Sequence, residues 1–101
     1  MLEISKRNAR KLGVQTLLFQ TQEECAELTK AISKFNRANG IGQITDISAD
    51  AAKSIMINEI ADVSICIEQL VYMLGCSDQV KECRAAAFDK VSKRYSNILD
   101  K

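Results

Sequence analysis

Apolar residues recur at alternating steps of four and three over two long stretches of the chain. In the first stretch the repeating positions are Leu17, Thr21, Glu24, Leu28, Ala31 and Phe35. In the second stretch they are Met56, Ile60, Val63, Ile67, Leu70 and Leu74. A third, looser stripe comprises Val80, Cys83, Ala87, Val91, Tyr95 and Ile98. This spacing is typical of amphipathic helices, and no segment alternates with the period of two of a half-buried strand, so we predict an all-α fold.

Glycine positions divide the chain into helices. There is no proline, and glycine occurs only at positions 13, 40, 42 and 75. We therefore predict helices over residues 3–12, 14–39, 48–74 and 77–99, with Ser48 as the N-cap of the third and Gly75 ending it. Short turns between them favour an antiparallel four-helix bundle. With 101 residues the chain is one domain, residues 1–101, small enough that we expect it to form a homo-oligomer.

Composition excludes several classes of function. Fourteen basic and thirteen acidic residues give a net charge of +1, which argues against a nucleic-acid or membrane-surface binder. No signal peptide or membrane span is apparent, so we expect a cytoplasmic protein. Histidine is absent, which excludes Ser-His and Cys-His catalysis. The four cysteines form no CxxC pair, and we interpret them as reduced core residues.

Acidic residues interrupt the apolar stripes of both long helices. Glu24 occupies a stripe position, with Glu27 one turn further on. In the second long helix Glu59 and Asp62 are likewise three residues apart, within a line that also contains Ile55, Cys66, Gln69 and Met73. Four carboxylates meeting between packed helices would repel one another unless a cation joined them. Oxygen ligands without histidine or thiolate favour Mg²⁺, with Mn²⁺ as a substitute. The alternative is a solvated face on which Glu27 pairs with Lys30.

Basic residues near the C-terminus are candidates for binding phosphate. Lys90, Lys93 and Arg94 lie within about one and a half turns of the last predicted helix. Equally, they form a basic last turn that interacts favourably with the helix dipole. Lys30, Lys34, Arg37 and Lys53 flank the loop at residues 40–47, and we interpret each as a surface residue.

The two acidic motifs and the C-terminal segment together resemble the MazG-like family of all-α nucleoside triphosphate pyrophosphohydrolases. The segments that carry this resemblance are QEECAELTKAISKFNR, NEIADVSICIEQL and FDKVSKRYSNIL, between Gln22 and Leu99. The resemblance implies a helical bundle assembled as a dimer or a dimer of dimers. It also implies Mg²⁺ bound by Glu24, Glu27, Glu59 and Asp62. Tryptophan, which several branches of the family place around the base, is absent here, so base and sugar specificity are left open.

The activity implied is hydrolysis of a ribo- or deoxyribonucleoside triphosphate to the monophosphate and pyrophosphate, serving nucleotide-pool cleansing. In this hypothesis the cation positions water for in-line attack, and Glu23 orients or deprotonates that water. Two alternatives stay open. The first is a non-catalytic helical dimer that binds a nucleotide or a protein partner, and the second is hydrolysis of a different pyrophosphate-containing metabolite.

Overall fold

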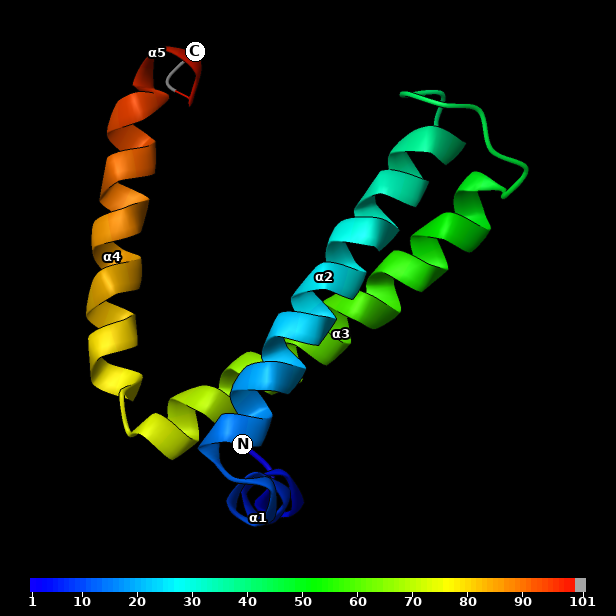
Figure 1. Ribbon diagram of the computed structural model, residues 1–101. Helices are drawn as coiled ribbons and strands as arrows, with labels where there is room; N and C mark the ends of the chain where they lie inside the picture. Colours follow the sequence, from blue (N-terminus) through cyan, green and yellow to red (C-terminus); the bar gives the residue numbers. More distant parts are fainter. Residues whose placement is uncertain (100–101) are drawn as a thin grey trace.

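The computed structural model describes residues 1–99 as an all-helical protein without strands, which confirms the predicted fold class (Figure 1). Five helices follow one another along the chain: α1 (Glu3–Leu12), α2 (Val14–Ala38), α3 (Ala49–Leu74), α4 (Ser77–Arg94) and the short α5 (Ser96–Leu99). Within the described residues, no helix combines the length and apolar character needed to cross a membrane.

The helix ends follow the predicted local signals. Gly13 separates α1 from α2 with a φ of 81°. Ser48 caps α3, because its Oγ accepts a hydrogen bond from the Ala51 backbone N–H at 3.1 Å. Gly75 ends α3 in the left-handed conformation, with a φ of 61°. The predicted last helix is interrupted at Tyr95, where a turn separates α4 from α5.

The centre of the molecule is an antiparallel hairpin of α2 and α3 (Figure 1). Its small core is built largely from small side chains, and the buried apolar residues are Ala9, Leu17, Ala31, Ala52, Val63 and Cys66. Leu17 is the largest fully buried side chain, at the end of the hairpin where α1 also packs. The stripe predicted for α2 is therefore the face that meets α3.

Only some residues of the stripe predicted for α3 face the core. Ile60, Ile67 and Leu74 are about half exposed, at 50%, 48% and 56%. Cys66 and Gln69, which belong to the neighbouring line, are buried instead. The face of α3 that packs inward lies between these two lines of residues. Sequence spacing alone does not distinguish the lines, because both have nearly the same helical period. An aliphatic ridge is consequently left uncovered on α3.

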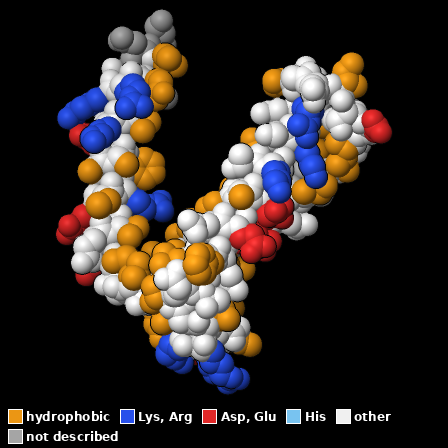
Figure 2. Space-filling view, in the orientation of Figure 1, with side chains coloured by type: hydrophobic (Ala, Val, Ile, Leu, Met, Phe, Trp, Pro, Cys, Tyr) orange, Lys and Arg blue, Asp and Glu red, His pale blue; other side chains and the backbone are white. Residues whose placement is uncertain are grey.

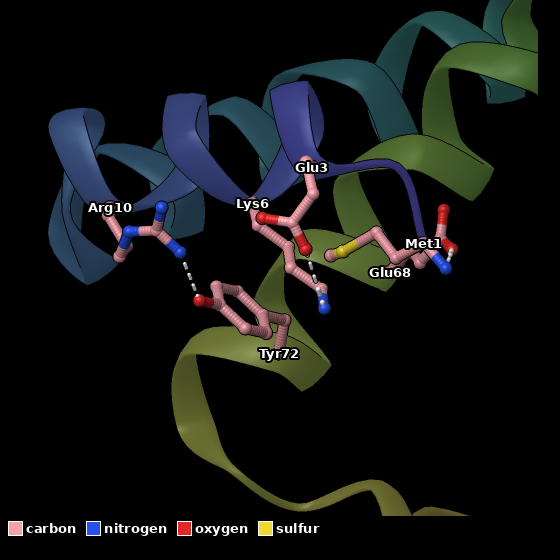
Figure 3. A network of polar contacts seen from close by, with 6 residues as sticks. All are labelled: Met1, Glu3, Lys6, Arg10, Glu68 and Tyr72. Atoms are coloured by element: carbon pink, nitrogen blue, oxygen red, sulfur yellow. Dashed lines mark hydrogen bonds and ion pairs between the residues drawn. The ribbon is translucent and has the colours of Figure 1, made fainter.

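Polar contacts fasten α1 across the C-terminal half of α3 (Figure 3). The Arg10 guanidinium donates a hydrogen bond to the Tyr72 hydroxyl at 2.5 Å, and Lys6 lies 5.7 Å from the centre of the same ring. The Gln69 side chain donates to the Ser5 carbonyl at 3.2 Å. These contacts explain why a buried glutamine is acceptable in the core of α3.

Helix α4 leaves the hairpin after Gly75 and packs only against α3 and α5, with no contact to α2 (Figure 1). None of its described residues is buried. The radius of gyration is 17.2 Å, against about 13 Å for a compact domain of this length. Within one chain, α4 does not pack beside α2 and α3 as in the predicted four-helix arrangement, and among residues 1–99 no element buries its apolar side.

Candidate metal centre

Three of the four predicted carboxylate ligands converge between α2 and α3. Glu24 projects from α2, and Glu59 and Asp62 project from one face of α3. One carboxylate oxygen from each lies within 4.8 Å of the others. Figure 2 shows acidic side chains gathered midway along the hairpin, away from both the loop and α1. We call Glu24, Glu59 and Asp62 the acidic triad.

Burial differs across the acidic triad. Glu24 and Glu59 are half-buried, whereas Asp62 is exposed. The Glu59 Oε2 atom is inaccessible to solvent and has no hydrogen-bond partner within the described chain. A buried carboxylate oxygen without a hydrogen-bond partner is costly, and a positive partner would lower that cost.

The electrostatics of the acidic triad act most strongly on Glu24. Partial burial raises the pKa of the Glu24 carboxyl above its usual value, and contact with the Glu59 carboxyl raises it further. Charge repulsion from Asp62, Glu59 and Glu23 acts in the same direction. The neighbouring carboxylates and partial burial therefore make the ionised form of Glu24 less favourable than in an isolated glutamate.

Cys66 is a buried thiol near Glu24 and Asp62 of the acidic triad. Burial raises the pKa of the Cys66 thiol, and the nearby Glu24 carboxylate adds to this effect. A raised pKa keeps the sulfur as an unreactive thiol. The interpretation of cysteines as core residues is correct for Cys66, but Cys25 and Cys83 are exposed and Cys76 is only half-buried.

The other two predicted acids lie beside the acidic triad. Glu27, the fourth predicted ligand, is directed to Lys30, with 3.5 Å between its Oε1 and the lysine Nζ. Glu23 is exposed, yet close enough to Glu24 to influence its pKa. Glu27 thus forms the helical ion pair considered as the alternative from sequence, and Glu23 borders the site.

The structure does not bring the predicted phosphate ligands to the acidic triad within one chain. Lys90, Lys93 and Arg94 are all exposed on α4, which has no contact with α2. Lys93 pairs with Asp89 of its own helix at 3.0 Å. The physical reason is that α4 diverges from the hairpin directly after Gly75.

The sequence and structure were compared with protein-family models, curated proteins and solved structures, and none of the three comparisons found a match. Any inference of function therefore depends on the residues and geometry described above.

Proposed function

We propose that the protein is a Mg²⁺-dependent nucleoside triphosphate pyrophosphohydrolase with the acidic triad as its metal-binding site. The convergence of Glu24, Glu59 and Asp62 supports this function more than any other observation. Carboxylate clusters of this kind bind Mg²⁺, which commonly completes its coordination shell with substrate phosphates. The resemblance of both acidic motifs to the MazG-like family points to the same chemistry.

The donor set fits a divalent cation. One carboxylate oxygen from each of Glu24, Glu59 and Asp62 lies within 4.8 Å of the others, so these three residues would hold the cation together with water. The buried Glu59 Oε2 would gain the positive partner that it lacks. Rotation of Glu27 away from Lys30 would supply a fourth carboxylate, because their ion pair is exposed and weak.

The chain's own residues have distinct parts in the proposed reaction. A bound divalent cation supplies Lewis-acid polarisation of phosphoryl oxygens and offsets the negative charge of the triphosphate. Glu24, Glu59 and Asp62 would hold that cation midway along the hairpin. Glu23 accepts a proton from water as the water oxygen attacks the α-phosphorus. The bond between the α-phosphorus and the bridging oxygen breaks, releasing pyrophosphate and leaving the monophosphate.

We further propose that a second copy of the chain completes the bundle. The accessible surface is 7736 Å², about 2,000 Å² more than expected for a compact monomer of 11.2 kDa. Exposed large apolar side chains include the ridge Ile60, Ile67 and Leu74 on α3 and Phe88 and Val91 on α4. If both copies bury this excess, the total interface falls within the range of obligate homodimers. A partner's α4 would then be free to approach the acidic triad with Lys90, Lys93 and Arg94, in a dimer or a dimer of dimers.

Product analysis tests the proposed activity. The purified protein is incubated with Mg²⁺ and a panel of ribo- and deoxyribonucleoside triphosphates, and the products are separated by ion-exchange chromatography. We expect monophosphate and pyrophosphate from at least one substrate, and no turnover by Glu24→Gln or Asp62→Asn. The control is Asp50→Asn, which removes an acid from the first turn of α3 outside the acidic triad.

Other product patterns contradict the proposal. Diphosphate with inorganic phosphate would indicate a different bond, and normal turnover by both triad variants would overturn the site. If no triphosphate in the panel is hydrolysed while nucleotides still bind, the result would instead favour the non-catalytic helical dimer.

A further inference from the structure

One side of the α2–α3 hairpin is apolar and is left uncovered by residues 1–99. Two rows of exposed residues run along it with a spacing of seven, which keeps each row on nearly one face of its helix. The row on α2 is Leu18, Cys25 and Ile32, and the row on α3 is Ile60, Ile67 and Leu74. The aliphatic members are 40–56% exposed, and Cys25 is exposed as well. We call these six residues the hairpin face.

Both rows lie on the same side of the hairpin. Leu18 directly follows the buried Leu17 on α2, and Ile67 directly follows the buried Cys66 on α3. One residue corresponds to a turn of about 100° around the helix axis. Because both helices are right-handed and run antiparallel, this step leads from the packed interface to the same side of the hairpin on each of them. The two rows therefore form one continuous surface.

The charged residues of the hairpin avoid this surface. Between the ends of the α2 row, the charged side chains all point to other sides of the helix, and they are Glu23, Glu24, Glu27 and Lys30. Figure 2 shows acidic side chains and, nearer the loop, basic side chains together on one face of the hairpin. The positions that flank the two rows on their outer side are uncharged, namely Gln22, Thr29, Ser64 and Val71. The hairpin thus has one charged side and one side without charge.

The hairpin face is large enough for a specific interface. Each row spans two heptads, about 21 Å along a helix, and the two helices together are about 20 Å wide. The resulting footprint of about 400 Å² is in the range of the largest apolar patches on monomers, which are often functional. One chain also exposes about 2,000 Å² more surface than a compact monomer of its mass. An occupant that buries the hairpin face accounts for part of this excess.

We propose that two copies of the chain pack hairpin face against hairpin face around a two-fold axis, an inference that rests on the second copy in the proposed function and assigns its contact surface. A two-fold contact pairs a surface with itself. The occupant must therefore present two uncharged apolar rows of matching length, and the hairpin face meets this requirement. The four-helix bundle predicted from sequence then consists of two hairpins. Helix α4 of each copy stays outside this four-helix core, free to contact the outer surface of the partner.

The acidic triad lies away from this contact. Asp62 precedes Ile67 by five residues, which places the two side chains about 140° apart around α3. Each copy therefore keeps its own acidic triad open to solvent, and cation binding does not depend on dimerisation. Cys25 behaves differently, because it is exposed in a single chain and covered in the dimer.

Ile67→Asp and Ile65→Asp form a matched pair of variants. The two side chains are 48% and 49% exposed on the same helix, but Ile65 lies about 160° around α3 from Ile67, in a hollow beside α1. Mass in solution is measured by sedimentation velocity over a range of concentrations. We expect a wild-type species of twice the 11.2 kDa of one chain. Ile67→Asp should raise the dimer dissociation constant at least about 100-fold, because it places a charge in an apolar contact twice, whereas Ile65→Asp should change it less than about threefold.

Alkylation of Cys25 by iodoacetamide, followed by peptide mass spectrometry, reports on the same contact. We expect slow alkylation in the wild-type dimer and in Ile65→Asp, and alkylation about 10-fold faster in Ile67→Asp. In the wild type, the rate should also rise on dilution below the dimer dissociation constant, a measurement that needs no variant. Cys66 is buried within the chain and should stay protected throughout, which separates dissociation from unfolding.

The outcomes distinguish this contact from the proposals on which it rests. Equal effects of Ile67→Asp and Ile65→Asp, or a wild-type dimer in which Cys25 reacts as fast as in Ile67→Asp, would overturn the hairpin contact and leave the second copy standing. A wild type that is monomeric at every concentration would overturn both. None of these measurements requires turnover, so failure of the proposed hydrolysis would be seen separately, in the product analysis.

Discussion

Phe88 provides a quantitative test of the proposed second copy. Its side chain is 65% exposed on α4, over a shallow apolar surface formed with Ala87 and Val91. A phenylalanine side chain offers about 200 Å², so about 130 Å² stays in contact with water in a single chain. At about 25 cal/mol per Å², burying that surface contributes up to about 3 kcal/mol per chain, and a symmetric dimer contains it twice.

Phe88→Asp removes this contribution and places a charge in the interface. We expect at least a hundredfold increase in the dimer dissociation constant, which corresponds to about 3 kcal/mol. The assay is sedimentation equilibrium over a wide concentration range. Ala86→Asp is the control, because it introduces the same charge on the same exposed helix but roughly opposite Phe88. The reasoning is refuted if the wild type is a monomer throughout, or if Phe88→Asp and Ala86→Asp dissociate alike.

Two further predictions concern stability. Leu17→Ala should lower the free energy of unfolding by about 3–5 kcal/mol in urea titrations followed by circular dichroism, because Leu17 is fully buried; a loss below about 1 kcal/mol would contradict its place in the core. The second concerns pH: since the pKa of Glu24 is raised in the folded state, the metal-free folded protein keeps a proton that the unfolded chain has lost. Stability should therefore fall as pH rises from the ordinary glutamate pKa through the raised one, and stay low above it. Glu24→Gln, or saturating Mg²⁺ at neutral pH, should relieve this loss, and an identical pH slope in Glu24→Gln would contradict the assignment.

The fold could be predicted wherever local chemistry decides the structure. Gly13, Ser48 and Gly75 determine helix ends through backbone conformation and capping, which depend on few neighbours. The direction of α4 could not be predicted, because an apolar stripe shows that a face is to be covered but not which surface covers it. The same uncertainty caused the error on α3, where Ile60 and Ile67 are exposed while Cys66 is buried.

The candidate site could likewise be predicted only in part from the sequence. Glu24, Glu59 and Asp62 could be found because acids within apolar stripes are unusual and the hairpin brings both stripes together. Glu27 was harder to place, since a helix offers it Lys30 as a local partner in every arrangement.

Cation binding by the acidic triad is the claim that most needs a direct measurement. Mn²⁺ can replace Mg²⁺, and electron paramagnetic resonance measures the concentration of unbound Mn²⁺. A titration of the protein with Mn²⁺ therefore measures cation binding without any substrate. We predict saturable binding by the wild type, competition by Mg²⁺, and at least tenfold weaker binding by Glu24→Gln, Glu59→Gln and Asp62→Asn, with Asp50→Asn unchanged. A wild-type titration no different from that of the three triad variants would contradict the account.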